Sequence, residues 1–305
     1  MEDKRVQWLD IAKGITIILM VLGHTSIPRI ASNFIFAFHM PLFFFASGWC
    51  TNWNKYSFGD FALKRLKTLA IPFVVYSVIV IILGELIGAE DIRWFVVLCN
   101  GWKGYALWFV PVLFFASVIA KAIMTFIKKK RLRYIICAFL ILLGVGLRYY
   151  HVYLPWALAT VPYAICLVLL GSSLKKYQKY IDKPRLWIFV VGLLLTFVIS
   201  YRWRMDMAWN SIIPVILLTI SAVSGTAMMF TLSSYLTKIP KFARFLETIG
   251  KETFIVMAFS QILCLTISHY FRCNKLIEYG MMFSILFFIV LMKNGINKIL
   301  GQKIL

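Results

Sequence analysis

Three ionisable residues lie in the first apolar stretch of the chain, within the segment LDIAKGITIILMVLGH. Asp10 precedes Lys13 by three residues, which is close enough for an ion pair on one helix face. His24 follows Lys13 by eleven residues, which in a helix is within roughly 20° of the same face and about 16 Å further along the axis. Ionisable groups are costly in an apolar segment, so each is a candidate for function. An imidazole titrates near neutral pH, so we interpret His24 as a candidate general base, with Lys13 and Asp10 as its catalytic partners.

A structural interpretation of the same residues remains open. Asp10 and Lys13 can be interfacial residues, with the lysine amine reaching out to water. His24 can be an interfacial histidine capped by Thr25 or Ser26.

The segment FAFHMPLFFFASGW holds a second histidine, His39, next to a proline. Pro41 predicts a kink in a helix, and Ser47 beside Gly48 allows a close helix approach. His39 and Ser47 are candidates for polar groups that support the chemistry or contact an acceptor. The alternative is a satisfied, buried histidine beside the kink. Trp108 is a third such candidate, and its alternative role is packing and interface anchoring.

A basic cluster in FALKRLKTLAIPF comes shortly before Pro72. Lys64, Arg65 and Lys67 are candidates for binding the phosphates of a nucleotide-like ligand. The alternative is the ordinary excess of positive charge in cytoplasmic loops.

The composition favours a membrane protein over a soluble one. Of 305 residues, 61% are hydrophobic, and the mean hydropathy is +0.83, more apolar surface than a soluble domain of this length can cover. The net charge of +21 does not indicate nucleic-acid binding here, because Lys and Arg gather in cytoplasmic loops facing anionic lipid. We therefore predict an all-α, polytopic bundle forming a single integral-membrane domain over residues 1–305.

Ten stretches are long and apolar enough to be membrane spans. The predicted spans are Trp8–Ile27, Asn33–Trp53, Leu69–Gly88, Ala106–Ile127, Leu132–Leu147, Trp156–Leu174, Leu186–Ser200, Ser211–Leu236, Thr253–Phe271 and Leu276–Met292. The connections between them alternate between Lys/Arg-rich and Lys/Arg-poor, which predicts that both termini are cytoplasmic. Lys121 is an exception, because it falls inside the fourth span. We read the first span as retained rather than removed as a signal, because no small-residue cleavage site follows it.

Several classes of enzyme have no support in the sequence. No P-loop, HExxH, GxSxG or dinucleotide-binding pattern occurs, and no two cysteines are spaced as CxxC. We therefore predict no metal site and no permanently bound cofactor.

The strings LDIAKGITIILMVLGH, FIFAFHMPLFFFASGW and LKRLKTLAIPF together resemble the membrane acyltransferase-3 family of bacterial polytopic O-acyltransferases acting on sugars and glycans. LWFVPVLFF and IGKETFIVMAF resemble further markers of that family. The resemblance implies a ten-helix bundle that transfers an acyl group, usually acetyl from acetyl-CoA, to an extracytoplasmic sugar or glycan.

The family's residues carry over at some positions and not at others. Its first-helix arginine and histidine correspond to Lys13 and His24, and its basic stretch corresponds to Lys64 and Arg65. Lysine keeps the charge of arginine but loses its bidentate fork. A tyrosine and a histidine expected in the ninth span are replaced here by Met257 and Ser260, which implies a different acceptor.

From the sequence we predict an O-acetyltransferase in the cell membrane, with acetyl-CoA as co-substrate and His24 as general base. Its partners would be acyl-CoA, a sugar or glycan acceptor and membrane lipids; a homo-oligomer remains open. A secondary transporter or exporter of a small polar solute or lipid-linked glycan is the alternative, with the same ionisable residues as a proton relay. A scaffold that binds partners in the membrane is a third.

Overall fold

The computed structural model describes residues 6–102, 105–271 and 274–299, and this part of the chain is helical, with no β-strand. The predicted all-α bundle is therefore confirmed. The α-helices are α1 Gln7–Gly23, α2 Arg29–Phe36, α3 His39–Cys50, α4 Phe58–Arg65, α5 Ile71–Leu86, α6 Trp94–Asn100, α7 Phe109–Phe126, α8 Lys130–Tyr149, α9 Val161–Leu174, α10 Gln178–Asp182, α11 Leu186–Arg202, α12 Val215–Leu236, α13 Pro240–Lys251, α14 Thr253–Tyr270 and α15 Lys275–Ile299. Short π or 3₁₀ segments are η1 Leu66–Ala70, η2 Glu90–Ile92, η3 Ala106–Trp108, η4 Pro155–Thr160, η5 Lys175–Tyr177 and η6 Met207–Trp209.

Each predicted span corresponds to a helix or to a run of consecutive helices. Within the described residues, eight helical stretches are long and apolar enough to cross a membrane. The remaining two predicted spans are α1 and α11, which have 17 residues each. At 1.5 Å per residue such a helix is about 26 Å long, close to the thickness of the hydrocarbon core. The chain is therefore a multi-pass membrane protein.

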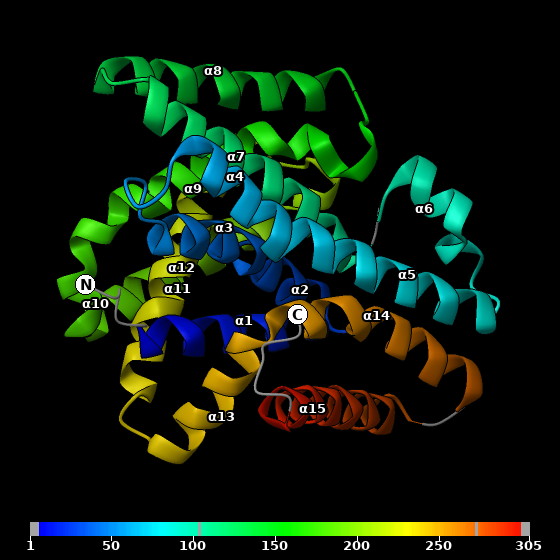
Figure 1. Ribbon diagram of the computed structural model, residues 1–305. Coiled ribbons are helices and arrows are strands. Elements are labelled where there is room, and N and C mark those ends of the chain that lie inside the picture. The colour runs from blue at the N-terminus through cyan, green and yellow to red at the C-terminus, as the bar shows by residue number, and fades with distance from the viewer. Residues whose placement is uncertain (1–5, 103–104, 272–273, 300–305) are drawn as a thin grey trace.

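Helix α1 lies in the middle of the bundle, where it packs against α3, α12, α13 and α14 (Figure 1). Its contact with α13 is a backbone contact through two glycines. A Cβ atom at Gly14 would lie 2.1 Å from the carbonyl oxygen of Leu246, and one at Gly250 would lie 1.8 Å from that of Asp10. Only glycine permits this approach, so the two helices are fixed closely against each other.

The second predicted span is broken into α2 and α3, and the break lies between Phe36 and His39. Pro41 explains it, because a proline ring clashes with the carbonyl group four residues earlier, here that of Ala37. The kink expected from Pro41 is present, and it places His39 at the first position of α3.

The third predicted span begins earlier than expected. Helix α4 starts after Ser57, whose hydroxyl accepts a hydrogen bond from the backbone N–H of Asp60 at 3.1 Å. It continues through the π-helical segment η1 into α5. The sequence window missed this start because the first turns are polar, with Asp60, Lys64 and Arg65.

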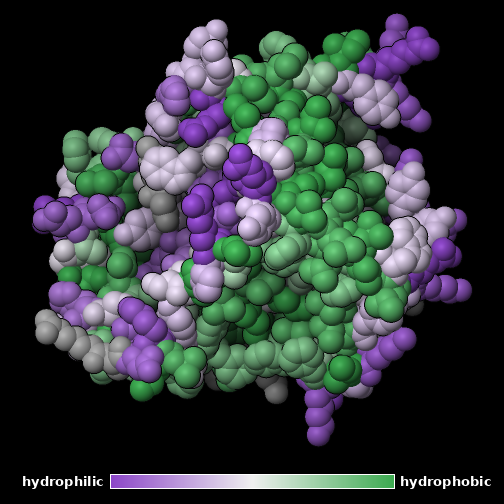
Figure 2. All heavy atoms as spheres, turned by 180° about the vertical axis from the view of Figure 1, so that it is seen from behind, coloured by the Kyte–Doolittle hydropathy of each residue, from purple (hydrophilic) through white to green (hydrophobic). Residues whose placement is uncertain are grey.

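The surface has the pattern of a membrane protein. A broad apolar band crosses the face shown in Figure 2, and hydrophilic residues border it on both sides. Helix α8 lies at the edge of the bundle (Figure 1), and Gly144 is its sole buried residue. The connections 51–57, 127–129 and 175–185 lie together at one end, at the left in Figure 1, and carry Lys55, Lys128, Lys129 and the five basic residues of 175–185. We call this the basic end.

Candidate functional site

A cavity of about 410 Å³ opens among α1, α3, α4, α7 and α14. We call it the arginine cavity, and its lining includes Lys13, Ser47, Tyr56, Lys64, Arg65, Phe109 and Met257. Lysine and arginine side chains thus come from two separate elements, α1 and α4, to one space, which suits an anionic ligand.

Arg65 is held inside this cavity by the end of α3. Its Nη2 atom donates hydrogen bonds to the hydroxyl oxygens of Ser47, at 3.3 Å, and Thr51, at 3.2 Å. Its guanidinium carbon lies 5.1 Å from the ring centroid of Phe61. In the described part of the chain no carboxylate forms an ion pair with Arg65. Its positive charge is therefore positioned by neutral groups and remains available to a ligand.

The other predicted donor-binding residues lie differently. Lys64 donates to the hydroxyl of Tyr56 at 3.3 Å and lies over that ring, at the edge of the arginine cavity. Lys67 is exposed and is not part of the cavity lining. Lys13 lines the cavity, and its amine is 2.6 Å from the carboxylate of buried Asp10.

The loop 51–57 closes one side of the arginine cavity and is anchored by a lysine from α7. Lys121 is buried, and its amine donates hydrogen bonds to the carbonyl oxygens of Trp53 and Tyr56, the latter at 2.7 Å. The indole N–H of Trp53 also donates to the hydroxyl of Ser172 at 2.6 Å. Lys121 stood out in the sequence as a charge within a span, and its structural role is to hold this loop.

A second cavity, of about 250 Å³, lies at the opposite end of α1. We call it the histidine cavity, and its lining includes His24, Phe36, His39, Trp108, Arg204, Asp206 and Trp209. A further cavity of about 500 Å³ adjoins it and shares His24 and Trp209.

His24 has the geometry of a general base. Its Nδ1 atom lies 2.8 Å from the carbonyl oxygen of Met20, which can only accept a hydrogen bond. In the neutral ring Nδ1 therefore carries the hydrogen, and Nε2 is left with the basic lone pair. His39 is fixed in the same way by the carbonyl oxygen of Ile35 at 3.0 Å, and the two imidazole centroids are 6.2 Å apart.

The connection between α11 and α12 adds two charged residues that the sequence did not single out. Arg204 stacks on Phe36 at 3.9 Å and donates to the hydroxyl of Ser32 at 3.0 Å. Its guanidinium is 4.0 Å from the carboxylate of Asp206. Burial raises the pKa of Asp206, and the nearby charges of Arg204 and His24 partly oppose that rise. The sequence could have indicated these residues as candidates, because this connection combines arginines with an acidic residue inside an apolar sequence.

Only a thin partition separates the two cavities. On α3, Met40 lines the histidine cavity and Phe43, one turn later, lines the arginine cavity. On the chain entering α7, Trp108 lines the histidine cavity and the next residue, Phe109, lines the arginine cavity. The rings of Phe43 and Phe109 are 5.8 Å apart.

The predicted catalytic residues are therefore divided between the two cavities. Asp10 and Lys13 are together at the arginine cavity, and His24 is at the histidine cavity. Of the predicted supporting residues, His39 and Trp108 lie with His24, and Ser47 lies with Arg65.

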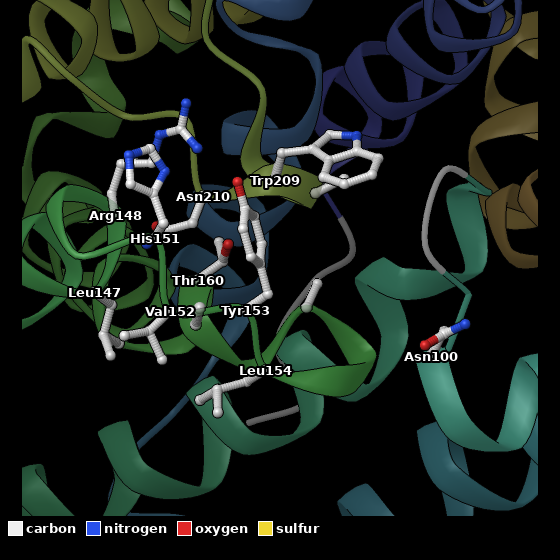
Figure 3. Close-up of a pocket in the computed structure, with 13 residues that line it drawn as sticks. Asn100, Leu147, Arg148, His151, Val152, Tyr153, Leu154, Thr160, Trp209 and Asn210 are labelled. Carbon is white, nitrogen blue, oxygen red and sulfur yellow. The ribbon is translucent and has the colours of Figure 1, made fainter.

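Another opening, separate from the cavity of about 500 Å³, lies on the same side as the histidine cavity and shares Trp209 with its lining. Arg148 and His151 lie beside each other at one edge, and Asn100 lies at the opposite edge (Figure 3). The side chain of Tyr153 stands between them, near Trp209. Trp209 therefore borders three neighbouring spaces, with its side chain partly exposed.

Comparison with known proteins gives one match. The family model Acyl_transf_3, described as an acyltransferase domain, matches residues 6–292. No curated protein and no solved structure matches the chain.

Proposed function

Because this chain belongs to the acyltransferase-3 family and is a membrane acyltransferase, we propose that it moves an acetyl group from acetyl-CoA to a hydroxyl of a sugar or glycan across the membrane. The observation that carries the proposal is the pair of cavities on α1, one with cations and one with an imidazole, separated by a thin partition. With the basic end in the cytoplasm, as the distribution of Lys and Arg favours, the arginine cavity receives the donor.

The arginine cavity suits the CoA part of the donor. CoA carries several phosphates, and guanidinium and ammonium groups are the side chains that bind phosphate most strongly. Arg65 and Lys64 contact the phosphates, and Lys13 assists from α1. The rings of Phe43 and Phe109 are in contact, so they must move apart for the pantetheine arm to pass along α1 and bring the thioester to His24. Lys67 contributes only to the general positive field, since it lies outside the cavity.

The chemical step uses His24 as general base. Its Nε2 atom takes the proton of the acceptor hydroxyl while that oxygen attacks the thioester carbonyl. The new C–O ester bond forms as the C–S bond breaks, and the imidazolium returns the proton to the leaving CoA thiolate. The carboxylate of Asp206 and the second imidazole, His39, line the same cavity as His24.

The acceptor enters from the side of Trp209. An exposed indole offers a flat apolar face, and a sugar ring presents C–H groups on its own face and hydroxyls at its edge. Trp209 therefore serves as the stacking surface, while the charged pair Arg204 and Asp206 meets hydroxyl groups.

The proposal is tested with radiolabelled acetyl-CoA and protein in nanodiscs. Arg65→Ala should weaken binding about 10- to 100-fold, the effect of losing one charged hydrogen-bonding group. Lys67→Ala is the matched control, because it removes a neighbouring cation outside the cavity, and it should weaken binding far less than Arg65→Ala. His24→Ala should bind acetyl-CoA but hydrolyse it about 10²- to 10⁴-fold more slowly.

Three results would contradict the proposal. If the wild-type protein binds neither acetyl-CoA nor longer acyl-CoAs, acyl-CoA is excluded as the donor. Equal effects of Arg65→Ala and Lys67→Ala would show that the arginine cavity does not hold the phosphates. A folded His24→Ala protein with normal turnover would exclude His24 as the base.

A further inference from the structure

An apolar groove lies on the face of α3 that points away from the arginine cavity. It has a volume of about 490 Å³ and is bounded by α3, α9, α10, α11 and α12. Phe45 and Trp49 of α3 line the groove, whereas Ala46, Ser47 and Cys50 line the arginine cavity. The two spaces therefore lie on different faces of one helix and have separate walls.

The groove has almost no polar groups. Its lining is aliphatic and aromatic except for the tyrosine hydroxyls, the indole N–H groups of Trp49 and Trp187, and Thr226, whose hydroxyl donates to the carbonyl oxygen of Ala222 at 2.7 Å. In a membrane such a space does not remain empty, because its walls would lose their dispersion contacts, and so apolar a lining holds water poorly. A hydrocarbon chain is the ligand that fits it.

Cations surround the mouth of the groove at the basic end. Two tyrosines of its lining hold them: the amine of Lys176 is 4.9 Å from the ring centroid of Tyr177, and Lys179 and Arg185 are 5.2 and 5.3 Å from that of Tyr180. The segment 175–185 contains five basic residues and one acidic residue, Asp182. Asp182 accepts a hydrogen bond from the indole of Trp8 at 2.9 Å, so its carboxylate is engaged on the α1 side.

From this combination we infer that the groove is a binding site for an anionic glycerophospholipid. One acyl chain lies between Trp49, Trp187 and Phe230, and the phosphate meets Lys176, Lys179 and Arg185 at the mouth. The positive charge at the mouth favours an anionic lipid over a zwitterionic one, because a zwitterionic lipid supplies the acyl chain without a net negative charge. This inference does not depend on the proposed enzymatic reaction.

The test is a titration of full-length protein with dioleoyl phosphatidylglycerol and, separately, dioleoyl phosphatidylcholine, with bound lipid counted by native mass spectrometry. The mouth variant is K176Q/K179Q/R185Q. Its matched control is K128Q/K129Q/R131Q, which removes the same number of charges from an exposed basic segment that does not line the groove. A third variant, Ala227→Trp, fills the groove and leaves its charges intact.

Wild-type protein should retain one phosphatidylglycerol at least about tenfold more tightly than phosphatidylcholine. The mouth variant should lose that preference, the control variant should keep it, and Ala227→Trp should lose the tightly bound lipid. Equal binding of the two lipids, or equal losses in the mouth and control variants, would overturn the headgroup assignment. Unchanged binding in a folded Ala227→Trp protein would show that the acyl chain lies elsewhere.

Discussion

The glycine contact between α1 and α13 controls the position of every candidate residue on α1, so Gly14→Ala is a severe test of the fold. The added Cβ would lie 2.1 Å from the carbonyl oxygen of Leu246, where real Cβ atoms keep at least 3.0 Å. The helices must therefore separate by about 1 Å at this point. The neighbour is a backbone atom and cannot turn aside, so the whole helix moves.

The size of the effect follows from that displacement. Overpacking of this kind costs about 1–3 kcal/mol of stability. A shift of about 1 Å at reacting groups can lower the rate about 100-fold. Because α1 carries Lys13 at one cavity and is followed directly by His24 at the other, we expect turnover to fall by more than the loss of stability explains.

The assay combines thermal unfolding in nanodiscs with acetyl-CoA hydrolysis, and the control is Gly146→Ala on α8. A Cβ there meets no atom within 4 Å, and replacing a helical glycine by alanine stabilises by about 0.5–1 kcal/mol. Gly250→Ala, which would bring its Cβ 1.8 Å from the carbonyl oxygen of Asp10, should behave like Gly14→Ala. If Gly14→Ala were as stable and as active as Gly146→Ala, α1 and α13 would not be in backbone contact and the placement of α1 would be wrong.

Three further predictions concern the surroundings of the two cavities. Lys121→Met should release the loop 51–57 and raise the KM for acetyl-CoA with little change in kcat; a pure loss of kcat, measured in the same hydrolysis assay, would contradict an anchoring role. Trp209→Ala should abolish transfer to saccharide acceptors while acetyl-CoA hydrolysis continues, and Trp203→Ala, an exposed tryptophan of the same connection outside the cavities, should transfer normally. Burial raises the pKa of Asp206 in the folded protein, so the fold binds this proton more tightly than the unfolded chain, and its contribution to stability grows as pH falls through that pKa. Asp206→Asn should therefore raise the melting temperature at neutral pH more than at acidic pH, and an equal change at both would refute the assignment.

The membrane character and the helices were predictable because they depend on local patterns of apolar residues. All ten predicted spans contain a helix, and the break near Pro41 follows from proline geometry alone. The start of α4 was missed because its polar first turns lie outside any apolar window. The length of α1 was overestimated, since the helix ends at Gly23 before Pro28 rather than at Ile27.

The candidate site was predictable only where its residues lie on one element. The pairing of Asp10 with Lys13 follows from their spacing, and this ion pair is present in the structure. The meeting of Arg65 with Ser47, and of Arg204 with the histidine cavity, joins residues far apart in the chain, and no single-sequence pattern encodes such contacts. The position of Lys67 was equally out of reach, because its exclusion from the arginine cavity depends on which side of η1 faces that cavity, and Thr68 and Leu69 are on that side.

The partition formed by Met40, Phe43, Trp108 and Phe109 has an electrical consequence. In an energised membrane two polar cavities that approach each other from opposite faces concentrate the voltage drop on the thin layer between them. Moving one elementary charge across that layer then involves nearly the full potential, about 2.3 kcal/mol per 100 mV. In the proposed reaction the CoA phosphates stay on one side of the layer, and the uncharged pantetheine arm and its acetyl group are the parts that cross. Acyl transfer through this protein should therefore be nearly insensitive to membrane voltage.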